Sequence, residues 1–350
     1  MTDLHTPYML RCIELARLGA GYVAPNPMVG AVLVYEGRII GEGYHQQYGQ
    51  AHAEVNCIKS VIEADRPHIS HATLYVSLEP CAHFGKTPPC SDLIIENKIP
   101  KVVIGCRDPF EEVNGKGIEK LRKAGIEVTA GVMETECIAL NKRFFTFHKH
   151  HRPYLILKWA QTANGKIAGV SDERLLISND YSNRLVQQWR SEEAAILVGT
   201  HTAGKDDPTL NNRSGRGVQP VRMILDRNLR LPQTLKIFDQ TQRTILFNGM
   251  KQEEKGNLVY HQIDTNQNIV QQILDACYQY NIQSILVEGG TQLLQSFINE
   301  EKWDEIRTIT NESLTIPEGL NAPTHKSNPI KTEKISTDRI TYYTNKQTNQ

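Results

Sequence analysis

The chain has 350 residues, which at about 100 to 200 residues per domain predicts two domains and excludes a single small one. Lys plus Arg and Asp plus Glu both total 39, so the formal net charge is zero and no charge excess draws the chain to nucleic acid or an anionic membrane. Apolar runs stay below the roughly 18 residues that cross a bilayer, and the N-terminal segment has no secretory pattern. We therefore expect a soluble, cytoplasmic protein with a small-molecule partner, no nucleic acid and no membrane; a homo-oligomer is left open.

The first half of the chain reads as a mixed α/β sheet, because short apolar runs alternate with helix-like segments from residue 30 to residue 128. The expected strands are 30–35, 39–44, 73–78, 102–105 and 126–129. Apolar residues recur at helical spacing between these strands, at Val55, Ile58, Val61 and Ile62, at Leu93 and Ile94, and at Ile118 and Leu121. This pattern predicts the order ββαβαβαβ.

The stretch 148–153, His-Lys-His-His-Arg-Pro, interrupts the apolar pattern. It predicts an exposed linker over 148–152 between a domain of residues 1–147 and a domain of residues 153–350. A metal site made by this histidine run is disfavoured, because adjacent side chains on an exposed connection point in different directions.

A second α/β series is expected beyond the linker. Its strands are 154–158, 195–198, 221–225, 244–247 and 285–288, and its helices lie near 179–190 and 269–280. The tail after Asn311 is rich in Thr, Asn and Lys, and residues 340–343 are expected as a final edge strand.

The sharpest chemical signal is His52-Ala53-Glu54, followed by Pro80-Cys81 and by Cys90. One imidazole and two thiolates make three zinc ligands and leave a fourth position for water, whereas a structural zinc takes four protein ligands. Zinc lowers the pKa of such a water, and a carboxylate that is not a ligand can carry its proton to a leaving amine. The candidate metal ligands are therefore His52, Cys81 and Cys90, and Glu54 is the candidate catalytic proton carrier. Because His52 and Glu54 would point about 200° apart on a regular helix, the site must lie at a helix start.

Each of these residues alone would more commonly be a core thiol or a hydrogen-bonded histidine. Their order, with Glu two residues after His and Pro before the first Cys, favours the metal site. Cys90 follows two prolines and is expected to open a helix, whose N-terminus favours a thiolate. The other cysteines are expected to be ordinary reduced thiols: Cys12, Cys57, Cys106, Cys137 and Cys277.

These residues resemble the cytidine-deaminase-like superfamily, whose signature is H-x-E followed by P-C-x-x-C, although residues 82–89 separate the two cysteines here. Within it, the segments 77–90 (SLEPCAHFGKTPPC), 25–32 (PNPMVGAV), 108–110 (DPF) and 115–117 (GKG) are similar to the pyrimidine deaminase of riboflavin biosynthesis, over nearly all of residues 7–145. The resemblance implies pocket residues around the pyrimidine and the ribose phosphate: Asn26, His83, Lys86, Thr87, Asp108 and Asn114. By themselves, Lys86, Thr87 and His83 suit a phosphate, and a solvated loop lysine is an equal alternative.

Three polar segments of the second half point to a nucleotide site. Strand 284–287 leads into Glu288-Gly289-Gly290-Thr291 and then into helical spacing, so glycine N–H groups at a helix start could hold a phosphate, although a tight turn with a helix cap explains them equally. The other two are the segment 158–166, in which a strand ends in a glycine-containing turn, and a polar loop at 200–210.

Together these segments resemble the dihydrofolate-reductase-like reductase that follows the deaminase in bifunctional riboflavin biosynthesis proteins, from about Arg152 to Ile309, with Thr-Ala-Asn-Gly at 162–165 in place of the usual Ser-x-Asp-Gly. The resemblance implies NADPH contacts from Ala160, Leu176, Thr202, Asp206, Gly290, Thr291, Gln292, Leu293, Leu294, Gln295 and Ser296. It implies a substrate pocket lined by Arg174, Arg190, Leu210, Arg213 and Glu288. The guanidinium groups of Arg190 and Arg213 suit a phosphate, whereas the residues alone favour surface charge.

The expected fold is α/β, with an N-terminal cytidine-deaminase-like mixed sheet and a C-terminal dihydrofolate-reductase-like domain. The implied function is zinc-dependent hydrolytic deamination of 2,5-diamino-6-ribosylamino-4(3H)-pyrimidinone 5′-phosphate, with one zinc per chain. NADPH-dependent reduction of the ribosyl group of 5-amino-6-(5-phosphoribosylamino)uracil to ribityl follows.

Two alternatives stay open. One is a deaminase of another nucleotide or of tRNA with a non-catalytic C-terminal domain; the neutral charge disfavours tRNA, and the long segment between the cysteines disfavours a cytidine deaminase. The other is a zinc-stabilised nucleotide-binding regulator with a closed fourth ligand.

Overall fold

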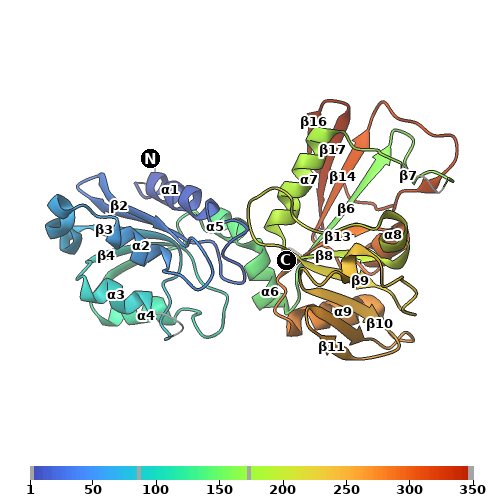
Figure 1. Ribbon diagram of the computed structural model, residues 1–350. Coiled ribbons are helices and arrows are strands. Elements are labelled where there is room, and N and C mark those ends of the chain that lie inside the picture. Colours follow the sequence, from blue (N-terminus) through green and yellow to red (C-terminus); the bar gives the residue numbers. More distant parts are fainter. Residues whose placement is uncertain (1–3, 85–87, 172–174, 346–350) are drawn as a thin grey trace. The chain divides into compact units, whose positions relative to one another are not determined.

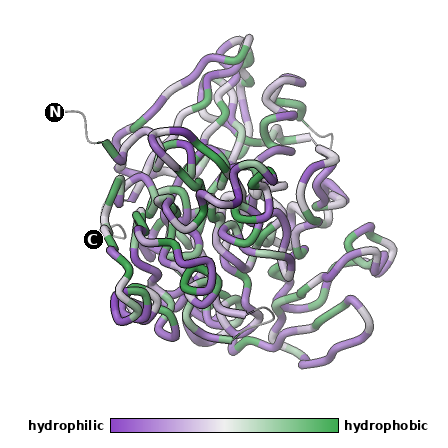
Figure 2. The backbone as a smooth tube through the Cα atoms, turned by 90° about the vertical axis from the view of Figure 1, so that its left-hand side faces the viewer, coloured by the Kyte–Doolittle hydropathy of each residue, from purple (hydrophilic) through white to green (hydrophobic). Residues whose placement is uncertain are grey.

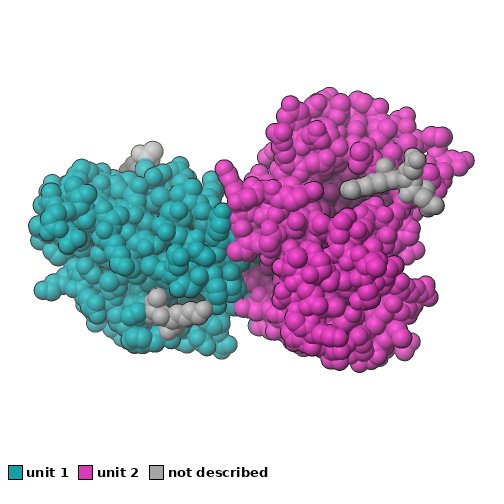
Figure 3. Space-filling view, in the orientation of Figure 1, with its two compact units in different colours: residues 1–151 teal, residues 152–350 magenta. Residues whose placement is uncertain are grey.

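The computed structural model describes residues 4–84, 88–171 and 175–345 (Figure 1). The chain forms two compact units, residues 1–151 and residues 152–350 (Figure 3). Three of the expected site residues, Lys86, Thr87 and Arg174, lie outside the described residues.

The first unit is built on one mixed sheet. Its strands are β1 (Gly30–Tyr35), β2 (Arg38–Tyr44), β3 (Thr73–Leu78), β4 (Lys101–Cys106) and β5 (Glu127–Ala130). Its helices are α1 (Thr6–Arg17), α2 (Ala53–Lys59), α3 (Cys90–Glu96), α4 (Lys116–Lys123), α5 (Glu134–Leu140) and α6 (Lys142–His150), with the 3₁₀ segment η1 (Glu63–His71). Within the described residues the strand order is β2-β1-β3-β4-β5, with β1 antiparallel to both neighbours and β3, β4 and β5 parallel.

Successive side chains of a strand point to opposite faces of the sheet. Helices cover both faces, so both sets of side chains are buried. Ala31 and Leu33 of β1 pack in one core with residues of α2, α3 and α4. Val32 and Val34 pack in a second core with residues of α1, α5 and α6. The helix starts that carry the zinc candidates therefore rest on one face of a sheet that is held from both sides.

The expected order ββαβαβαβ is confirmed between residues 30 and 130. The segments that form α1, α5 and α6 were not expected as helices. The expected linker is also wrong in its first part, because α6 runs through His148 to His150. The ring of His148 lies 4.4 Å from Phe144 and 4.9 Å from Phe110, so aromatic packing keeps this basic run helical. The helix ends only at His151, where the backbone turns to φ 51°.

The second unit is built on a large, mostly parallel sheet. Its strands are β6 (Tyr154–Thr162), β7 (Lys166–Ala168), β8 (Ala195–Gly199), β9 (Val221–Leu225), β10 (Thr244–Asn248), β11 (Glu253–Lys255), β12 (Leu258–Gln262), β13 (Ser284–Gly289), β14 (Glu305–Asn311), β15 (Leu320–Asn321), β16 (Pro329–Ile335) and β17 (Asp338–Thr344). Its helices are α7 (Asp180–Glu192), α8 (Thr200–Asp206), α9 (Ile269–Gln279) and α10 (Thr291–Asn299), with the 3₁₀ turn η2 (Lys236–Phe238).

In the described chain the main sheet has the order β11-β12-β10-β9-β8-β13-β6-β14-β17-β16, and β7 pairs separately with β15. The strands from β12 to β14 are parallel, and β11, β17 and β16 are antiparallel additions at the two ends. One face packs against α9 and α10, and the other packs against α7 and α8. The carboxyl ends of β6, β8 and β13, which lie side by side in Figure 1, meet at one edge of this sheet.

Two expectations for the second unit are corrected. The polar segment after β8 is not a loop at its start but the helix α8. The strand at 340–343 exists within β17, but it is not an edge strand, because β14 and β16 flank it on both sides. Ile340 is fully buried there, and the exposed, lysine-rich β16 takes the edge instead.

Hydrophobic and hydrophilic stretches alternate at short intervals along the backbone (Figure 2). Among the described residues, the helices are too short and too polar for any of them to span a membrane.

Candidate functional site

The three metal-ligand candidates converge in the first unit. The ligand atoms of His52, Cys81 and Cys90 all lie within 4.8 Å of one another. His52 Nδ1 is 3.7 Å from Cys81 Sγ and 3.3 Å from Cys90 Sγ. One nitrogen and two sulfurs at this spacing fit a tetrahedral zinc ion with its fourth position left for water.

Each ligand is fixed by the end of an element. His52 is the extended residue just before α2, and Glu54 lies in the first turn of that helix. Cys90 opens α3 after Pro89, as the sequence predicts. The N–H of Cys90 donates to Cys81 Sγ at 3.3 Å, and the N–H of Ser91 donates to the Cys81 carbonyl at 3.1 Å. The start of α3 therefore holds the Cys81 segment from the side.

The charges of the site suit metal binding and proton transfer. A hydrogen bond from Cys90 lowers the pKa of the Cys81 thiol to about 4 against the effect of burial, and His52 adds to this lowering. Burial raises the pKa of Glu54, which is 3% exposed, and the nearby His52 opposes that rise. Glu54 is therefore a carboxyl that readily takes up a proton beside the candidate metal ligands.

The amide of Asn26 is oriented by a histidine that the sequence reading missed. His45 is buried directly after β2, and its Nδ1 lies 3.0 Å from the carbonyl of Ala51, which can only accept. The proton is therefore on Nδ1, and Nε2 accepts from the Asn26 amide at 3.1 Å. This contact commits the NH₂ group of Asn26 to His45 and leaves its oxygen to accept from another group. The His45 ring lies 5.5 Å from that of His52, so Asn26 belongs to the surroundings of the candidate metal ligands.

Asp108 also reaches these surroundings. It is 7% exposed, and its Oδ1 accepts from the Phe110 N–H at 2.8 Å. Burial raises the pKa of Asp108 to about 7 despite that hydrogen bond, and the charges of Glu79 and Cys81 add to the rise.

The other described residues expected in the deaminase pocket, His83 and Asn114, differ in their exposure and in their contacts. His83 lines a cavity with Lys116, Lys120 and Lys123 of α4, and its buried Nδ1 has no hydrogen-bond partner in the described part of the chain. Asn114 is exposed, and its hydrogen bonds run through its backbone, from its N–H to Phe110 and from Arg107 to its carbonyl.

In the second unit one cavity gathers many of the residues expected at the reductase site. It lies at the carboxyl ends of β6, β8 and β13. The expected residues that line it are Ala160, Leu176, Arg190, Thr202, Asp206, Leu210, Glu288, Gly290 and Leu294. Gly290 brings the backbone close to the Thr202 hydroxyl, because a Cβ there would lie 3.2 Å from Thr202 Oγ1.

Other expected residues do not line this cavity: Thr291, Gln292, Leu293, Gln295, Ser296 and Arg213. Leu293 is in the hydrophobic core, and the Ser296 hydroxyl donates to the Gln292 carbonyl within α10. Arg213 is exposed, and its N–H donates to Gln187.

Arg190 and Glu288, which line the cavity, form a largely buried ion pair. The Arg190 guanidinium donates to both oxygens of Glu288, at 2.7 and 2.6 Å, and to the Asn211 carbonyl at 3.3 Å. Although burial raises it, the pKa of Glu288 is lowered to about 2 by Arg190 and by Lys158. The fork of Arg190 is thus engaged by a carboxylate, which differs from the expected phosphate clamp.

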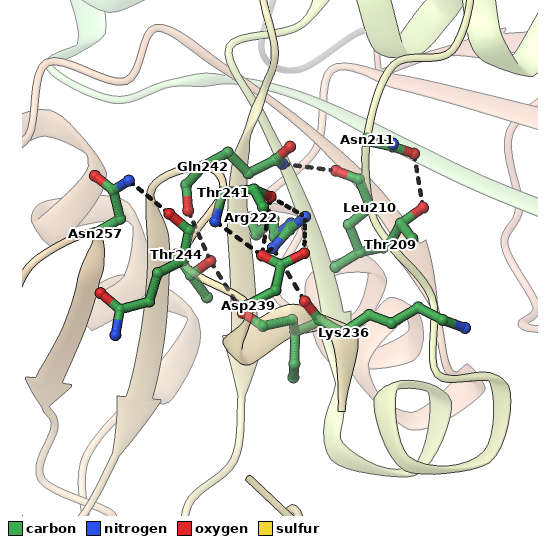
Figure 4. A network of polar contacts seen from close by, with 12 residues as sticks. Thr209, Leu210, Asn211, Arg222, Lys236, Asp239, Thr241, Gln242, Thr244 and Asn257 are labelled. Atoms are coloured by element: carbon green, nitrogen blue, oxygen red, sulfur yellow. Dashed lines mark hydrogen bonds and ion pairs between the residues drawn. The ribbon is translucent and has the colours of Figure 1, made fainter. Parts of the chain in front are cut away.

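A polar network next to the cavity fixes Leu210 (Figure 4). Gln242 donates to the Leu210 carbonyl at 3.1 Å, and Thr209 donates to the side chain of Asn211 at 2.6 Å. Beneath them the buried Arg222 pairs with Asp239 at 2.6 Å. Because Asn211 also contacts Arg190, this network connects the sheet to the ion pair.

Lys158 also lines the cavity. It lies in the predicted nucleotide segment 158–166 but, like His45, was not named as a site residue. Its signal was available: a single charge in the middle of the apolar strand Tyr-Leu-Ile-Leu-Lys-Trp. His45 gave a weaker signal, because a polar residue after a strand is common in loops.

Comparison with known proteins agrees with this division. A family model described as the cytidine and deoxycytidylate deaminase zinc-binding region matches residues 2–106, and one described as the RibD C-terminal domain matches residues 153–311. The riboflavin biosynthesis protein RibD of Aquifex aeolicus is 41% identical over 310 residues, which cover 87% of this chain and 86% of that protein. RibD of Actinobacillus pleuropneumoniae is 42% identical over 303 residues, covering 84% and 79%.

Two solved structures resemble the whole chain. The diaminohydroxyphosphoribosylaminopyrimidine deaminase/5-amino-6-(5-phosphoribosylamino)uracil reductase of Thermotoga maritima has a TM-score of 0.87 and 36% identity, covering 97% of this chain and 98% of that one. RibD of Acinetobacter baumannii has a TM-score of 0.89 and 31% identity, with coverage of 97% and 98%. The expected fold class is thereby confirmed, and the chain belongs to the RibD family of riboflavin biosynthesis enzymes, with a deaminase domain followed by a reductase domain.

Proposed function

We propose that the first unit hydrolytically deaminates 2,5-diamino-6-ribosylamino-4(3H)-pyrimidinone 5′-phosphate and that the second reduces the ribosyl group of the product to ribityl with NADPH. The observation that carries the proposal is the convergence of His52, Cys81 and Cys90 beside the buried carboxyl of Glu54. The separate cavity around Arg190 and Glu288 supports the second step. All seven cysteines lie in the described part of the chain and none forms a disulfide, which supports a cytoplasmic setting.

In the deamination, His52, Cys81 and Cys90 would hold the zinc ion, which when bound supplies Lewis acidity toward water. Glu54 takes a proton from the attacking water and gives it to the leaving nitrogen, which departs as ammonia. Its raised pKa suits a group that must both accept and release a proton.

The amide and carboxyl groups nearby orient the pyrimidine. The oxygen of Asn26 is the free end of an amide that His45 holds, so it accepts from an amino or ring N–H group of the base. Asp108 offers a buried carboxyl whose pKa of about 7 allows it to bind a hydroxyl either as donor or as acceptor. Nδ1 of His83, which has no hydrogen-bond partner among the described residues, and the lysines of α4 suit the phosphate end of the substrate.

In the reduction, Ala160, Thr202 and Gly290, which line the cavity, would hold NADPH, and Glu288 would contact the sugar of the substrate. When bound, NADPH would supply hydride to C1′ of the ribosyl group, which becomes the CH₂ group of ribityl as its bond to the ring oxygen breaks. The ring oxygen takes up a proton and becomes a hydroxyl. Lys205 lines the cavity and donates from Nζ to the Ser171 carbonyl at 2.8 Å, so it brings a positive charge to the cofactor side. This charge favours NADPH over NADH.

The test is incubation of the purified full chain with the diaminopyrimidine ribotide, with and without NADPH, followed by mass spectrometry of the products and assay of ammonia. Without NADPH the deaminated ribosyl compound should accumulate, and with NADPH it should become the ribityl compound. Failure to release ammonia from the ribotide contradicts the deaminase assignment. A preference for NADH contradicts the cofactor assignment.

A further inference from the structure

Glu79 is a buried acid of the first unit that neither the zinc constellation nor the proposed pocket includes. It follows β3 directly and lies two residues before Cys81. Its exposed fraction is 4%, so its carboxylate has left water and needs partners inside the protein.

Those partners are four backbone N–H groups. Oε1 accepts from Gly117 at 3.0 Å and from Ile118 at 3.1 Å. Oε2 accepts from Gly115 at 2.9 Å and from Asp108 at 3.2 Å. The first three donors belong to the start of α4, where N–H groups lack helical partners and the helix dipole favours a negative charge.

All four donors lie on the segment 108–118, which carries Asp108 and Asn114. The backbone of Glu79 is itself anchored, because its N–H donates to the Cys106 carbonyl at 3.0 Å. The carboxylate therefore ties the pocket segment to the chain that leads into Cys81.

A second contact presses the same two segments together. A Cβ at Gly117 would collide with the carbonyl oxygen of Pro80, so α4 begins directly against the residue that precedes the ligand Cys81. The hydrogen bonds of Glu79 and the close packing of Gly117 against Pro80 thus both fix the distance between the segment before Cys81 and the start of α4.

We propose that Glu79 is a positioning residue of the deaminase: its carboxylate sets Asp108 relative to Cys81, so that the pyrimidine ribotide is bound in register with the metal ligands. It touches neither the metal nor the substrate and acts through Asp108. The inference rests on the proposed function, because it takes Asp108 as a substrate contact.

The test is Glu79→Gln in the full, zinc-loaded chain, assayed for ammonia release from the diaminopyrimidine ribotide. The amide keeps the length of the side chain but turns an NH₂ group toward two N–H donors, so the segment shifts. We expect KM to rise roughly tenfold to a hundredfold, the effect of losing hydrogen bonds to a charged group, with a much smaller change in kcat. Zinc content and reductase activity should stay at the wild-type level. Glu96→Gln, which removes an exposed charge from α3, is the matched control and should change nothing.

A double-variant cycle with Asp108→Asn separates positioning from general weakening. If Glu79 acts through Asp108, the double variant should be little worse in KM than Asp108→Asn alone. Additive effects overturn the proposal, and so does loss of zinc in Glu79→Gln, or an unchanged KM in the folded variant.

Gly117→Ala provides a second route, since it displaces the start of α4 while the Glu79 carboxylate is intact, and it should raise KM in the same way. If neither variant can be obtained folded, Glu79 serves the stability of the unit and the proposal is overturned. A wild-type chain that releases no ammonia from the ribotide overturns the proposed function together with this inference. Wild-type activity beside an unaffected Glu79→Gln overturns this inference alone.

Discussion

Glu54 in the first unit is 3% exposed, and the side chain of Glu288 in the second is 8% exposed, yet their surroundings shift their pKa values in opposite directions. Glu54 has no arginine partner described at its carboxyl, and burial raises its pKa. Glu288 is held by both arms of Arg190, and its pKa falls to about 2. The first can exchange a proton during a reaction, whereas the second is a fixed negative charge. The partner of a buried acid, more than its burial, decides which chemistry it serves.

Dividing the chain into its two units should have the largest effect, and it tests whether Glu54 and Glu288 serve two independent sites. Each unit has its own sheet and its own cores, so we expect residues 1–151 to bind zinc and release ammonia from the ribotide. Residues 152–350 should oxidise NADPH only when the deaminated product is supplied. Each piece should lack the other activity completely. Assays of both pieces for ammonia and for NADPH consumption check this, and mutual dependence of the activities would contradict two independent sites.

Removing a metal ligand should abolish deamination. Cys81→Ala leaves one nitrogen and one sulfur, too few to hold zinc tightly. We expect zinc content, measured by elemental analysis of the purified chain, to fall to background, while reductase activity persists. Cys137→Ala removes a buried thiol that is not among the candidate ligands, so this variant should keep its zinc.

Glu54→Gln should separate proton transfer from metal binding. The variant keeps the ligands and loses the group that carries the proton, so ammonia release should fall by roughly 10² to 10⁴-fold. Zinc content and NADPH oxidation should match the wild-type chain. Metal loss, or near-normal ammonia release, would show that Glu54 does not have this role.

Glu288→Ala should weaken the second unit as well as its reaction. The substitution leaves the Arg190 guanidinium, whose side chain is 12% exposed, buried without its carboxylate. Breaking a buried ion pair in this way costs roughly 3 to 5 kcal/mol, which denaturant unfolding of residues 152–350 would measure. NADPH oxidation should be lost and ammonia release kept. Lost ammonia release in a folded variant would mean that the two sites are coupled.

Lowering the pH should also weaken the Arg190–Glu288 pair, with a smaller effect on the stability of the second unit. The folded pKa of Glu288 lies below the ordinary value of 4.5, at about 2, so its pairing stabilises the unit above about pH 4.5 and the contribution disappears as the pH falls toward 2. The stability difference between wild type and Glu288→Gln should therefore shrink by roughly 3 kcal/mol over that range. For the metal-free first unit the sign is reversed, because a raised pKa at Glu54 makes its ionisation destabilising.

The deaminase constellation could be predicted from the sequence because zinc accepts few ligand types. Imidazole and thiolate side chains at the ends of predictable elements identified His52, Cys81 and Cys90 before any contact was known. The need for His52 and Glu54 to face the same side also predicted that they lie at the start of α2. His45 and Glu79 could not be predicted, since their roles depend on carbonyl and N–H groups that only folding brings to them.

The reductase site was harder to predict from the sequence than the zinc site. Its ion pair joins residues 98 positions apart, and no fixed ligand geometry links an arginine to a glutamate in a sequence. The stretch 290–296 was expected as a continuous cofactor contact, yet in α10 successive side chains point in different directions, and Gly290 and Leu294 are the members that line the cavity. Lys158 was not singled out, although it is a lone charge in an otherwise apolar part of β6.

By itself, the sequence determined the two α/β series, the candidate zinc ligands and the family, because periodicity and ligand chemistry are local properties of the chain. Tertiary structure alone decided that the basic run at 148–150 continues a helix, because the phenylalanines that hold His148 come from two separate segments. It also decided that β17 is an interior strand and that Arg190 pairs with Glu288. Strand order and ion pairing depend on which segments, distant in the sequence, bury their apolar surfaces against each other. The free energy of this burial comes from contacts between segments, and local sequence patterns do not specify those contacts.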